Sequence, residues 1–229
     1  MDRNKTNLFP LTLLILAAVI ITGALIASGL EGFSQSAASV IAIAEMKVGV
    51  APTGFKFART GKGGPGQWTV VSDDTSFAGH VIEQSSTDRT DYRFPLAIFE
   101  PIVARNIEAS VRFKPVSGRV DQAGGIAVRV LDGDNYYVVR ANALEDNVRL
   151  YRVVKGRREQ IGGMDTKVAM SEWHALGLKA EGERLTVEFD GKTLFTTTGK
   201  TLTGAGMVAL WTKSDSVTRF DQIAITVLP

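Results

Sequence analysis

The sequence predicts an all-β protein built as an antiparallel, two-sheet jelly-roll sandwich. Three observations support this prediction. After residue 66, short runs rich in β-branched and aromatic residues recur at roughly 8–12-residue intervals, with turn-forming residues between them. Apolar and polar residues alternate within several runs, as expected of strands that have one buried face. No window of useful length shows the spacing of apolar residues that an amphipathic helix requires.

Residues 1–44 differ from the rest of the chain and predict export. Arg3 and Lys5 precede an uncharged run, residues 6–30, that is dense in Leu, Ile, Val and Ala. A positive start, an apolar stretch and then small residues are typical of a secretory signal. Ala42-Ile43-Ala44 satisfies the small-x-small rule for cleavage, and Ala27-Ser28-Gly29 is an earlier candidate.

The same apolar run has a second interpretation. About 20 apolar residues suffice to cross a bilayer as a helix. Residues 8–30 can therefore also stay in place as an N-terminal hydrophobic helix that anchors the chain in the inner membrane. Under either interpretation, the domain that follows is exported and lies in the periplasm or the extracellular space.

The composition excludes several classes of protein. The chain has no cysteine, which excludes disulfides, thiolate metal sites and a lipid-modified N-terminal cysteine. Its formal net charge is +2, and Lys and Arg are spread along the sequence. Nucleic-acid-binding proteins normally carry a basic stripe or cluster, so no nucleic-acid partner is expected. About 180 residues after the N-terminal segment are ample for one hydrophobic core.

The elements follow in a simple order. Residues 45–66 are rich in turn formers and predict a lead-in segment, and residues 67–229 predict the sandwich. The expected strands are Trp68–Ser72, His80–Gln84, Asn106–Lys114, Gly125–Leu131, Tyr136–Asn142, Asn147–Val153, Glu159–Gly162, His174–Ala180, Leu185–Phe189, Thr193–Thr197, Gly206–Thr212 and Thr218–Val227. Their number exceeds that of an immunoglobulin-type sandwich and suits a larger jelly roll. Asp132-Gly133 and Asp190-Gly191 predict hairpin turns, because Gly accepts a positive φ and Asp tolerates it.

The strands on either side of Asp132-Gly133 predict a polar face. We expect Leu131 to lie opposite Tyr136, because a one-residue slip would bury two arginines. The residues that then share the wet face are Arg129, Tyr136, Arg140 and Asn142. Those that share the core face are Ile126, Val128, Val130, Tyr137 and Val139. The next strand continues the wet face with Asn147, Arg149 and Tyr151.

A wet face of Arg, Tyr and Asn suits a carbohydrate. Aromatic rings stack on the apolar faces of sugar rings, while Arg and Asn hydrogen-bond hydroxyl groups or a carboxylate. A solvated face is also expected of any antiparallel sandwich, so a purely structural interpretation of each single residue stays open.

Several stretches together resemble a known family. They are Gly125-Ile126-Ala127-Val128-Arg129, Asn135–Asn142, Asn147–Tyr151, Glu172-Trp173-His174, Phe189-Asp190-Gly191, Leu210-Trp211-Thr212-Lys213 and Phe220-Asp221. From about Pro52 to Val227 the chain is similar to bacterial exported domains grouped with concanavalin A-like and laminin-G-like domains, near the 3-keto-disaccharide hydrolases. The resemblance implies a concanavalin A-like jelly roll. It also implies that Trp211 and Lys213 lie on one strand, with Trp211 as a stacking platform or as a lid over the sheet edge.

The sequence argues against a glycosidase of family 16 and assigns no catalytic residue. Retaining enzymes need two carboxylates about 5–5.5 Å apart. Relatives on this fold carry them as Glu-x-Asp-x-x-Glu on one strand, and the nearest match here, residues 188–193, ends in Thr193. Asp190-Gly191 within that stretch is better explained as a turn.

A metal site has weak support. Asp132 and Asp134 place oxygen ligands at alternate positions, as Ca²⁺ loops do, but no bidentate Glu follows them. A hairpin turn explains these residues better, so no cofactor is expected, with Ca²⁺ as the alternative.

The leading hypothesis is an exported, lectin-like carbohydrate-binding module without catalytic activity. Its ligand would be a glycan or small saccharide, held around Arg129, Tyr136, Arg140, Arg149 and Trp211. One alternative is a glycoside hydrolase acting on modified disaccharides or polysaccharide. The other is an envelope module that binds proteins.

Overall fold

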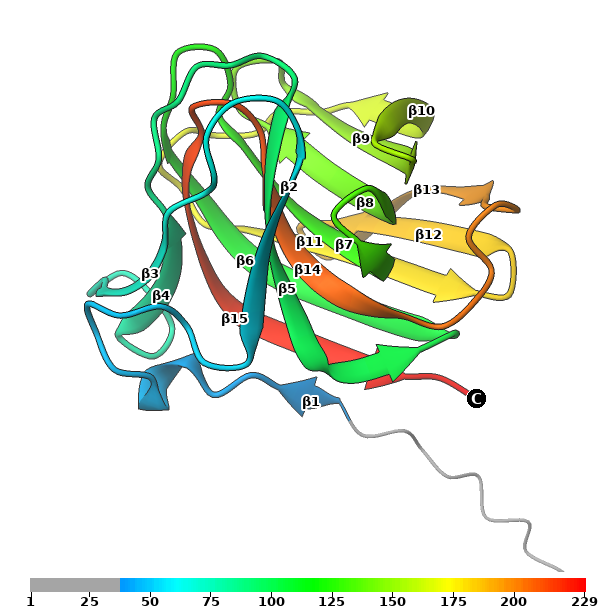
Figure 1. Ribbon diagram of the computed structural model, residues 1–229, viewed down its shortest axis with the longest axis horizontal. Coiled ribbons are helices and arrows are strands. Elements are labelled where there is room, and N and C mark those ends of the chain that lie inside the picture. Colours follow the sequence, from blue (N-terminus) through cyan, green and yellow to red (C-terminus); the bar gives the residue numbers. More distant parts are fainter. Residues whose placement is uncertain (1–37) are drawn as a thin grey trace, which may run out of the picture. The chain divides into compact units, whose positions relative to one another are not determined.

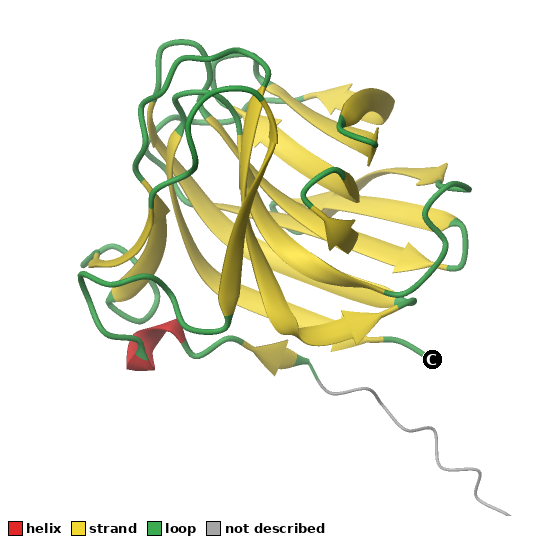
Figure 2. Ribbon diagram, viewed as in Figure 1, coloured by secondary structure: helices red, strands yellow, loops and turns green. Residues whose placement is uncertain are grey.

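Two antiparallel sheets packed face to face make up the part of the computed structural model that the structure describes, residues 38–229 (Figures 1 and 2). Within this range the only helical segment is the short 3-10 turn η1 (Ile43–Glu45). The predicted hydrophobic helix, the anchor over residues 8–30 and most of residues 1–44 lie outside the described residues. No helix among the described residues is long and apolar enough to cross a membrane. The prediction of an all-β antiparallel sandwich is confirmed.

Each sheet has a simple spatial order. Sheet A runs β13 (Lys192–Thr198), β12 (Arg184–Phe189), β11 (His174–Glu181), β6 (Ile107–Ser117), β15 (Val217–Val227), β4 (His80–Gln84) and β3 (Trp68–Ser72), with β1 (Ser39–Val40) paired to β15. Sheet B runs β10 (Arg157–Asp165), β9 (Asn147–Val154), β8 (Asn135–Asn142), β7 (Ala123–Asp132), β14 (Gly206–Thr212), β5 (Arg93–Ala104) and β2 (Phe55–Gly61).

All the predicted strands are present, and three further strands were missed. The short β1 adds to sheet A, while β2 and β5 form one edge of sheet B. β2 lies within residues 45–66, where the sequence predicted only a lead-in segment. β5 carries Pro95 and Pro101, and its first six residues are all buried, so it shows no alternation of apolar and polar residues. Such a strand is hard to predict from periodicity because both of its faces are covered.

Apolar side chains cover both faces of sheet B. One face packs on sheet A and contributes Ile126, Tyr137, Val139 and Leu210 to the core between the sheets. The other face carries a separate buried cluster, which we call the second core. Its larger members are Phe94, Leu96, Ile98, Tyr136, Val138, Val153 and Trp211. The opposite face of an antiparallel sheet is commonly solvated, so something must cover the second core.

Sheet B curls over its own second core, so that its β2–β5 edge contacts the turns at the ends of other strands of the same sheet. Thr60 at the end of β2 hydrogen-bonds to the carbonyl of Gly133 in the β7–β8 turn and lies 2.7 Å from the hydroxyl of Tyr136. Tyr92, just before β5, donates to the carbonyl of Gly156 in the β9–β10 turn, and its hydroxyl accepts from the Arg158 amide at 2.8 Å. These contacts join the β2–β5 edge to the far turns across the face of the sheet.

The predicted register of the β7–β8 hairpin holds at the turn, where Asp132 pairs with Asn135, but it is wrong by two residues along the rest of the hairpin. Instead of Leu131 facing Tyr136, the structure pairs Val128 with Tyr137 and Gly125 with Arg140. An irregularity between Val128 and Asp132 accounts for the shift, and Arg129 within it has a φ of 52°. Bulges of this kind re-aim the side chains of the bulged strand.

Arg129 therefore does not lie on a wet face. It is fully buried, and its guanidinium donates to the carbonyls of Arg105, Leu202 and Gly182 at 2.9, 3.1 and 2.5 Å. Three carbonyl acceptors satisfy the buried charge, which would otherwise be costly. Val130, predicted on the core face, lies in the second core for the same reason.

The close packing of the two sheets predicts that adding a methyl group at Gly124 strongly lowers the stability of the protein. A Cβ added there would lie 2.5 Å from the Phe113 ring and 3.0 Å from Thr218, between the two sheets. We expect Gly124→Ala to lower the free energy of unfolding by about 1–3 kcal/mol, measured by urea denaturation. Gly204→Ala is the control, because nothing lies within 4 Å of its added Cβ. Equal urea midpoints for the two variants would contradict this packing.

The second core predicts that Trp211 supports the fold. Its side chain is fully buried, stacks on Phe94 at 5.3 Å between ring centroids and donates to the Tyr136 hydroxyl at 3.2 Å. We expect Trp211→Ala to destabilise the protein by about 3–5 kcal/mol in thermal or urea denaturation. The half-buried Trp173 is the control, and its replacement by Ala should cost clearly less. A Trp211→Ala variant with natural stability would mean that this face is open to water.

Candidate functional site

The structure divides the predicted site residues among four environments. Arg129 is buried against carbonyls of three connecting loops, and Tyr136 and Trp211 lie in the second core. Arg149 lies on the outer face of sheet B next to Arg140 but pairs with Asp165 on the edge strand at 2.5 Å. The remaining residues gather at one end of that face, where β8 ends and β9 begins. They are Arg140, Asn142, Asn147, Tyr151 and Lys213.

Arg140 is the centre of the first half of this cluster. It extends from β8 and donates to Glu145 in the β8–β9 turn at 2.8 Å and to the Tyr151 hydroxyl at 3.2 Å. It also donates to the side-chain oxygen of Asn147, whose amide in turn donates to Glu145. Only 4% of the surface of Arg140 is exposed, whereas Glu145 is exposed.

Asp121 is the centre of the second half. It lies in the β6–β7 loop and is fully buried. Lys213 Nζ, from the loop after β14, lies 2.9 and 3.1 Å from its two carboxylate oxygens. Asn142 donates to the same carboxylate at 2.8 Å. We refer to the whole cluster as the polar site, which comprises Asp121, Arg140, Asn142, Glu145, Asn147 and Lys213.

Asp215 fixes the loop that presents Asp121. Its carboxylate accepts hydrogen bonds from the amides of Arg119, Val120 and Asp121 at 2.8, 3.0 and 3.1 Å. Burial acts to raise the pKa of Asp215, but these amide donors outweigh it and hold the pKa below its usual range. Because Asp215 follows Lys213 by two residues, one short loop positions both Lys213 and its partner Asp121.

The two acids of the polar site have opposite pKa shifts. Burial raises the pKa of Asp121, although Lys213 and Asn142 oppose the change. Burial also acts to raise the pKa of Glu145, but nearby Arg140 and the hydrogen bond from Asn147 lower it overall. Glu145 is therefore ionised at neutral pH and exposed at the rim of the site.

The polar site has hydrogen-bonding capacity that the protein does not use. Among residues 38–229, Arg140 Nε is one of the buried side-chain atoms that have no hydrogen-bond partner. Buried polar groups are nearly always satisfied, so such exceptions need an explanation. A ligand hydroxyl group can supply the acceptor that Arg140 Nε lacks.

Within residues 38–229, the aromatic side chains nearest the polar site are buried and provide no stacking platform. Trp211 and Tyr136 are buried, and the Arg158 guanidinium lies over the rings of Tyr151 and Phe94 at 4.3 and 4.5 Å from their centroids. The interpretations of Trp211 as an exposed platform or as an edge lid do not match its position. The groups that the polar site offers to a ligand are hydrogen-bonding and charged ones.

The candidate Ca²⁺ ligands form a hairpin turn. Asp132 accepts hydrogen bonds from the Asp134 amide at 2.7 Å and from the side chain of Asn135. In the part of the chain that the structure describes, no group of three or more His, Asp or Glu side chains is arranged to hold a metal ion. The role of Ca²⁺ stays an untested prediction.

Sequence reasoning missed Asp121, Glu145 and Asp215. All three lie in loops or turns, and Asp121 and Asp215 are 94 residues apart in the sequence. One signal was available: Asp215 comes two residues after Lys213, directly behind the stretch Leu210–Lys213 that carried the family resemblance.

Comparison with known proteins identifies the family. The model of the family described as the galactocerebrosidase C-terminal lectin domain matches residues 104–228, which is more than half of the chain. The chain belongs to this family. The matched part of the lectin domain contains every residue of the polar site, together with Asp215. A search of curated proteins finds no match.

Solved structures share the fold of this lectin domain at low sequence identity. The carbohydrate-binding module CBM66 from Bacillus subtilis is 17% identical with a TM-score of 0.57, over 74% of this chain and 94% of that module. A Bacillus subtilis protein of unknown function with a galectin-like fold is 8% identical with a TM-score of 0.53, over 75% of this chain and 88% of that protein. A Shewanella oneidensis protein of unknown function is 15% identical with a TM-score of 0.52, over 82% of this chain and 85% of that protein. The fold is thus that of lectin-like carbohydrate-binding modules.

The Asp215 contacts of the lectin domain predict an acid-sensitive loop. The pKa of Asp215 is lowered in the folded state, so its stabilising effect is present above its unfolded pKa, near 3.9, and is lost as the pH falls. We expect Asp215→Asn to cost about 1–3 kcal/mol at pH 7, because its amide group cannot accept from all three donors. Measured by urea denaturation from pH 7 to pH 3, the variant should lose less stability than the natural chain. The exposed Asp165, changed to Asn, is the control, and an Asp215→Asn variant that behaves like it would refute this role.

Proposed function

We propose that this protein is an exported, non-catalytic module that binds a glycan or small saccharide at the polar site. The observation that carries the proposal is the pairing of a buried Arg140, whose Nε has no acceptor, with the exposed carboxylate of Glu145 on a lectin-domain fold. Sugars present adjacent hydroxyl groups that donate and accept hydrogen bonds. Charged partners roughly double the strength of such bonds.

Each part of the polar site has a role in this proposal. Glu145, ionised and exposed, accepts hydrogen bonds from sugar hydroxyls, and Lys213, held by Asp121, donates to them. Arg140 and Asn147 hold Glu145 in place. Asp121, fully buried behind Lys213, orients its ammonium group. The interactions are already formed before the ligand arrives, which reduces the cost of binding.

Export is supported by the start of the chain. Arg3, Lys5 and the apolar residues 6–30 have the pattern of a signal or of an inner-membrane anchor. Ile43 is only 4% exposed and belongs to the core between the sheets. Cleavage after Ala44 would remove this core residue. We therefore favour either cleavage near Ala27-Ser28-Gly29 or retention as an anchor.

Glycan retention tests the proposal. We expect the protein to be retained on a glycan array or in gels containing soluble polysaccharides, with retention unchanged by EDTA. Arg140→Ala and Glu145→Gln should each weaken retention at least about tenfold, because each removes charge-assisted hydrogen bonds. Arg152→Ala is the matched control, because this arginine lies on the neighbouring strand β9, points to the other face of sheet B and pairs with exposed Glu159.

The outcomes separate this proposal from its rivals. Loss of retention in both site variants, with natural stability in Glu145→Gln, supports binding at the polar site. Equal retention of all three variants would defeat it. Co-purification of an envelope protein by a chain that no glycan retains would favour the protein-binding alternative.

Hydrolysis of a glycoside is the second candidate. The resemblance to the 3-keto-disaccharide hydrolases suggests a modified disaccharide as the substrate, and the opposite pKa shifts of Asp121 and Glu145 favour an acid–base pair. Against it, Asp121 is fully buried and both of its oxygens lie within 3.1 Å of Lys213 or Asn142. Release of reducing sugar that disappears in Asp121→Asn would favour hydrolysis over binding alone.

A further inference from the structure

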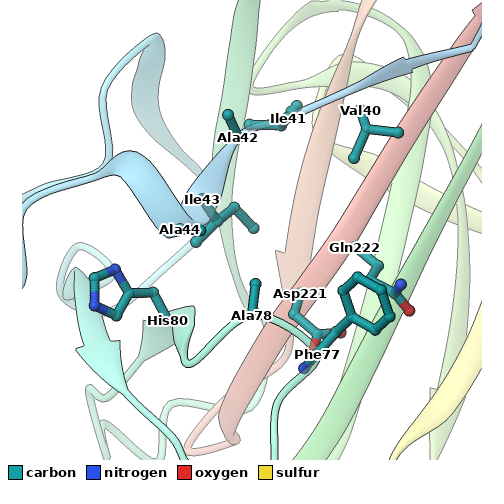
Figure 3. Close-up of a pocket in the computed structure, with 10 residues that line it drawn as sticks. All are labelled: Val40, Ile41, Ala42, Ile43, Ala44, Phe77, Ala78, His80, Asp221 and Gln222. Atoms are coloured by element: carbon teal, nitrogen blue, oxygen red, sulfur yellow. The ribbon is translucent and has the colours of Figure 1, made fainter.

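A small apolar pocket lies beside β15 of sheet A, between the β1–η1 segment and the loop that leads into β4. It has a volume of about 170 Å³, and residues 40–44, Phe77, Ala78, His80, Asp221 and Gln222 line it (Figure 3). The polar site lies on sheet B, so this pocket is independent of the proposed saccharide site. Its walls are mostly aliphatic, and Asp221 is its one acidic group.

The segment that forms one wall is held in place by the sheet. Ser39 and Val40 pair with Ile225 and Ala224 of β15, and the Ile41 amide donates to the carbonyl of Ile223 at 2.9 Å. Ile43 then enters the core between the sheets. Segments that are fixed to the sheet therefore form the pocket: β1 and η1 make one wall, and the β3–β4 loop makes the other.

Asp221 leaves one carboxylate oxygen unused at this pocket. The residue is 2% exposed, and its Oδ2 accepts from the Phe77 amide at 2.8 Å and from Arg112 at 3.3 Å. Among the described residues, Asp221 Oδ1 and His80 Nδ1 are buried and have no hydrogen-bond partner. In Figure 3, Asp221 lies beside Phe77, while His80 lies on the far side of Ala78.

A buried carboxylate oxygen without a donor is unfavourable. Burial raises the pKa of Asp221, even though the Phe77 amide and Arg112 act to lower it. A donor brought into the pocket would recover the hydrogen bond that water supplies in the unfolded chain. A cationic donor would gain most, because the carboxylate is poorly solvated.

We propose that this pocket binds a small apolar ligand, about the size of one aromatic ring, that carries an ammonium or another hydrogen-bond donor to Asp221 Oδ1. The volume fits this size, since an apolar cavity of about 150 Å³ holds benzene. The rim suits an apolar ligand because Phe77 and Val40 are 73% and 64% exposed there. The ring would lie against Ile41, Ile43 and Ala78, and its donor would face Asp221.

A matched series of probes tests the proposal. The isotope-labelled full chain is titrated with benzylamine, benzyl alcohol and toluene, and the backbone amide shifts of Ala42, Phe77 and Ala78 are followed. Benzylamine should produce saturable shifts at these residues and bind most tightly, benzyl alcohol should follow, and toluene should bind most weakly.

Two variants separate the apolar pocket from its acidic group. Asp221→Asn keeps an oxygen for the Phe77 amide but removes the charge, so it should weaken benzylamine binding roughly tenfold or more while leaving toluene unchanged. Ala78→Leu should fill the pocket and abolish binding of every probe. Asp165→Asn, an exposed carboxylate on sheet B, is the control and should change nothing.

The overturning results are equally definite. Absence of saturable shifts with any probe, in protein whose other amide signals are unchanged, would refute the pocket as a binding site. Equal benzylamine affinity in the natural chain and Asp221→Asn would refute the role of the carboxylate. Loss of glycan retention in Arg140→Ala has no bearing on either outcome.

Discussion

The curl of sheet B is the constraint on which the rest of this molecule depends. Because Thr60 at one edge reaches Tyr136 and the Gly133 turn at another corner, the outer face of the sheet closes over its own apolar side chains. A face that would otherwise meet water becomes a second core around Trp211. At the end of that face, where β8 gives way to β9, polar side chains gather, and of the polar site Glu145 is the exposed member. The position of the candidate binding site thus follows from how the sheet bends.

Periodicity predicted which side of a strand each residue occupies, but it could not predict what covers that side. Tyr136, Arg140 and Tyr151 do share one face, as alternation indicated. The same alternation predicted that Tyr136 is exposed to water. In the structure Thr60, which comes 76 positions earlier in the sequence, covers it. The prediction that Arg129 lies on the wet face was wrong for another reason. Its left-handed backbone and its three carbonyl acceptors come from tertiary structure, and nothing in Gly125–Leu131 signals a bulge.

The candidate site was predictable to the extent that strands build it. Arg140, Asn142 and Asn147 come from regular β-structure and lie beside one another as predicted, but all three are buried and not wet. The carboxylates that organise them come from loops, where no period constrains the side chain. Asp215 is an example that periodicity could not predict. Its three amide contacts determine where Asp121 and Lys213 meet. Loop residues of this kind commonly carry function on a rigid β scaffold.

The most direct test follows the indole N–H signal of Trp211 by NMR while a retained saccharide is titrated into the protein. If the second core is closed and the ligand binds at the polar site, the amide signals of Glu145 and Asn147 should shift. The Trp211 indole signal, hydrogen-bonded to Tyr136, should stay in place. A Trp211 signal that moves with saturation, while the Glu145 and Asn147 signals remain unchanged, would show that the sugar enters the curled face and would contradict this account.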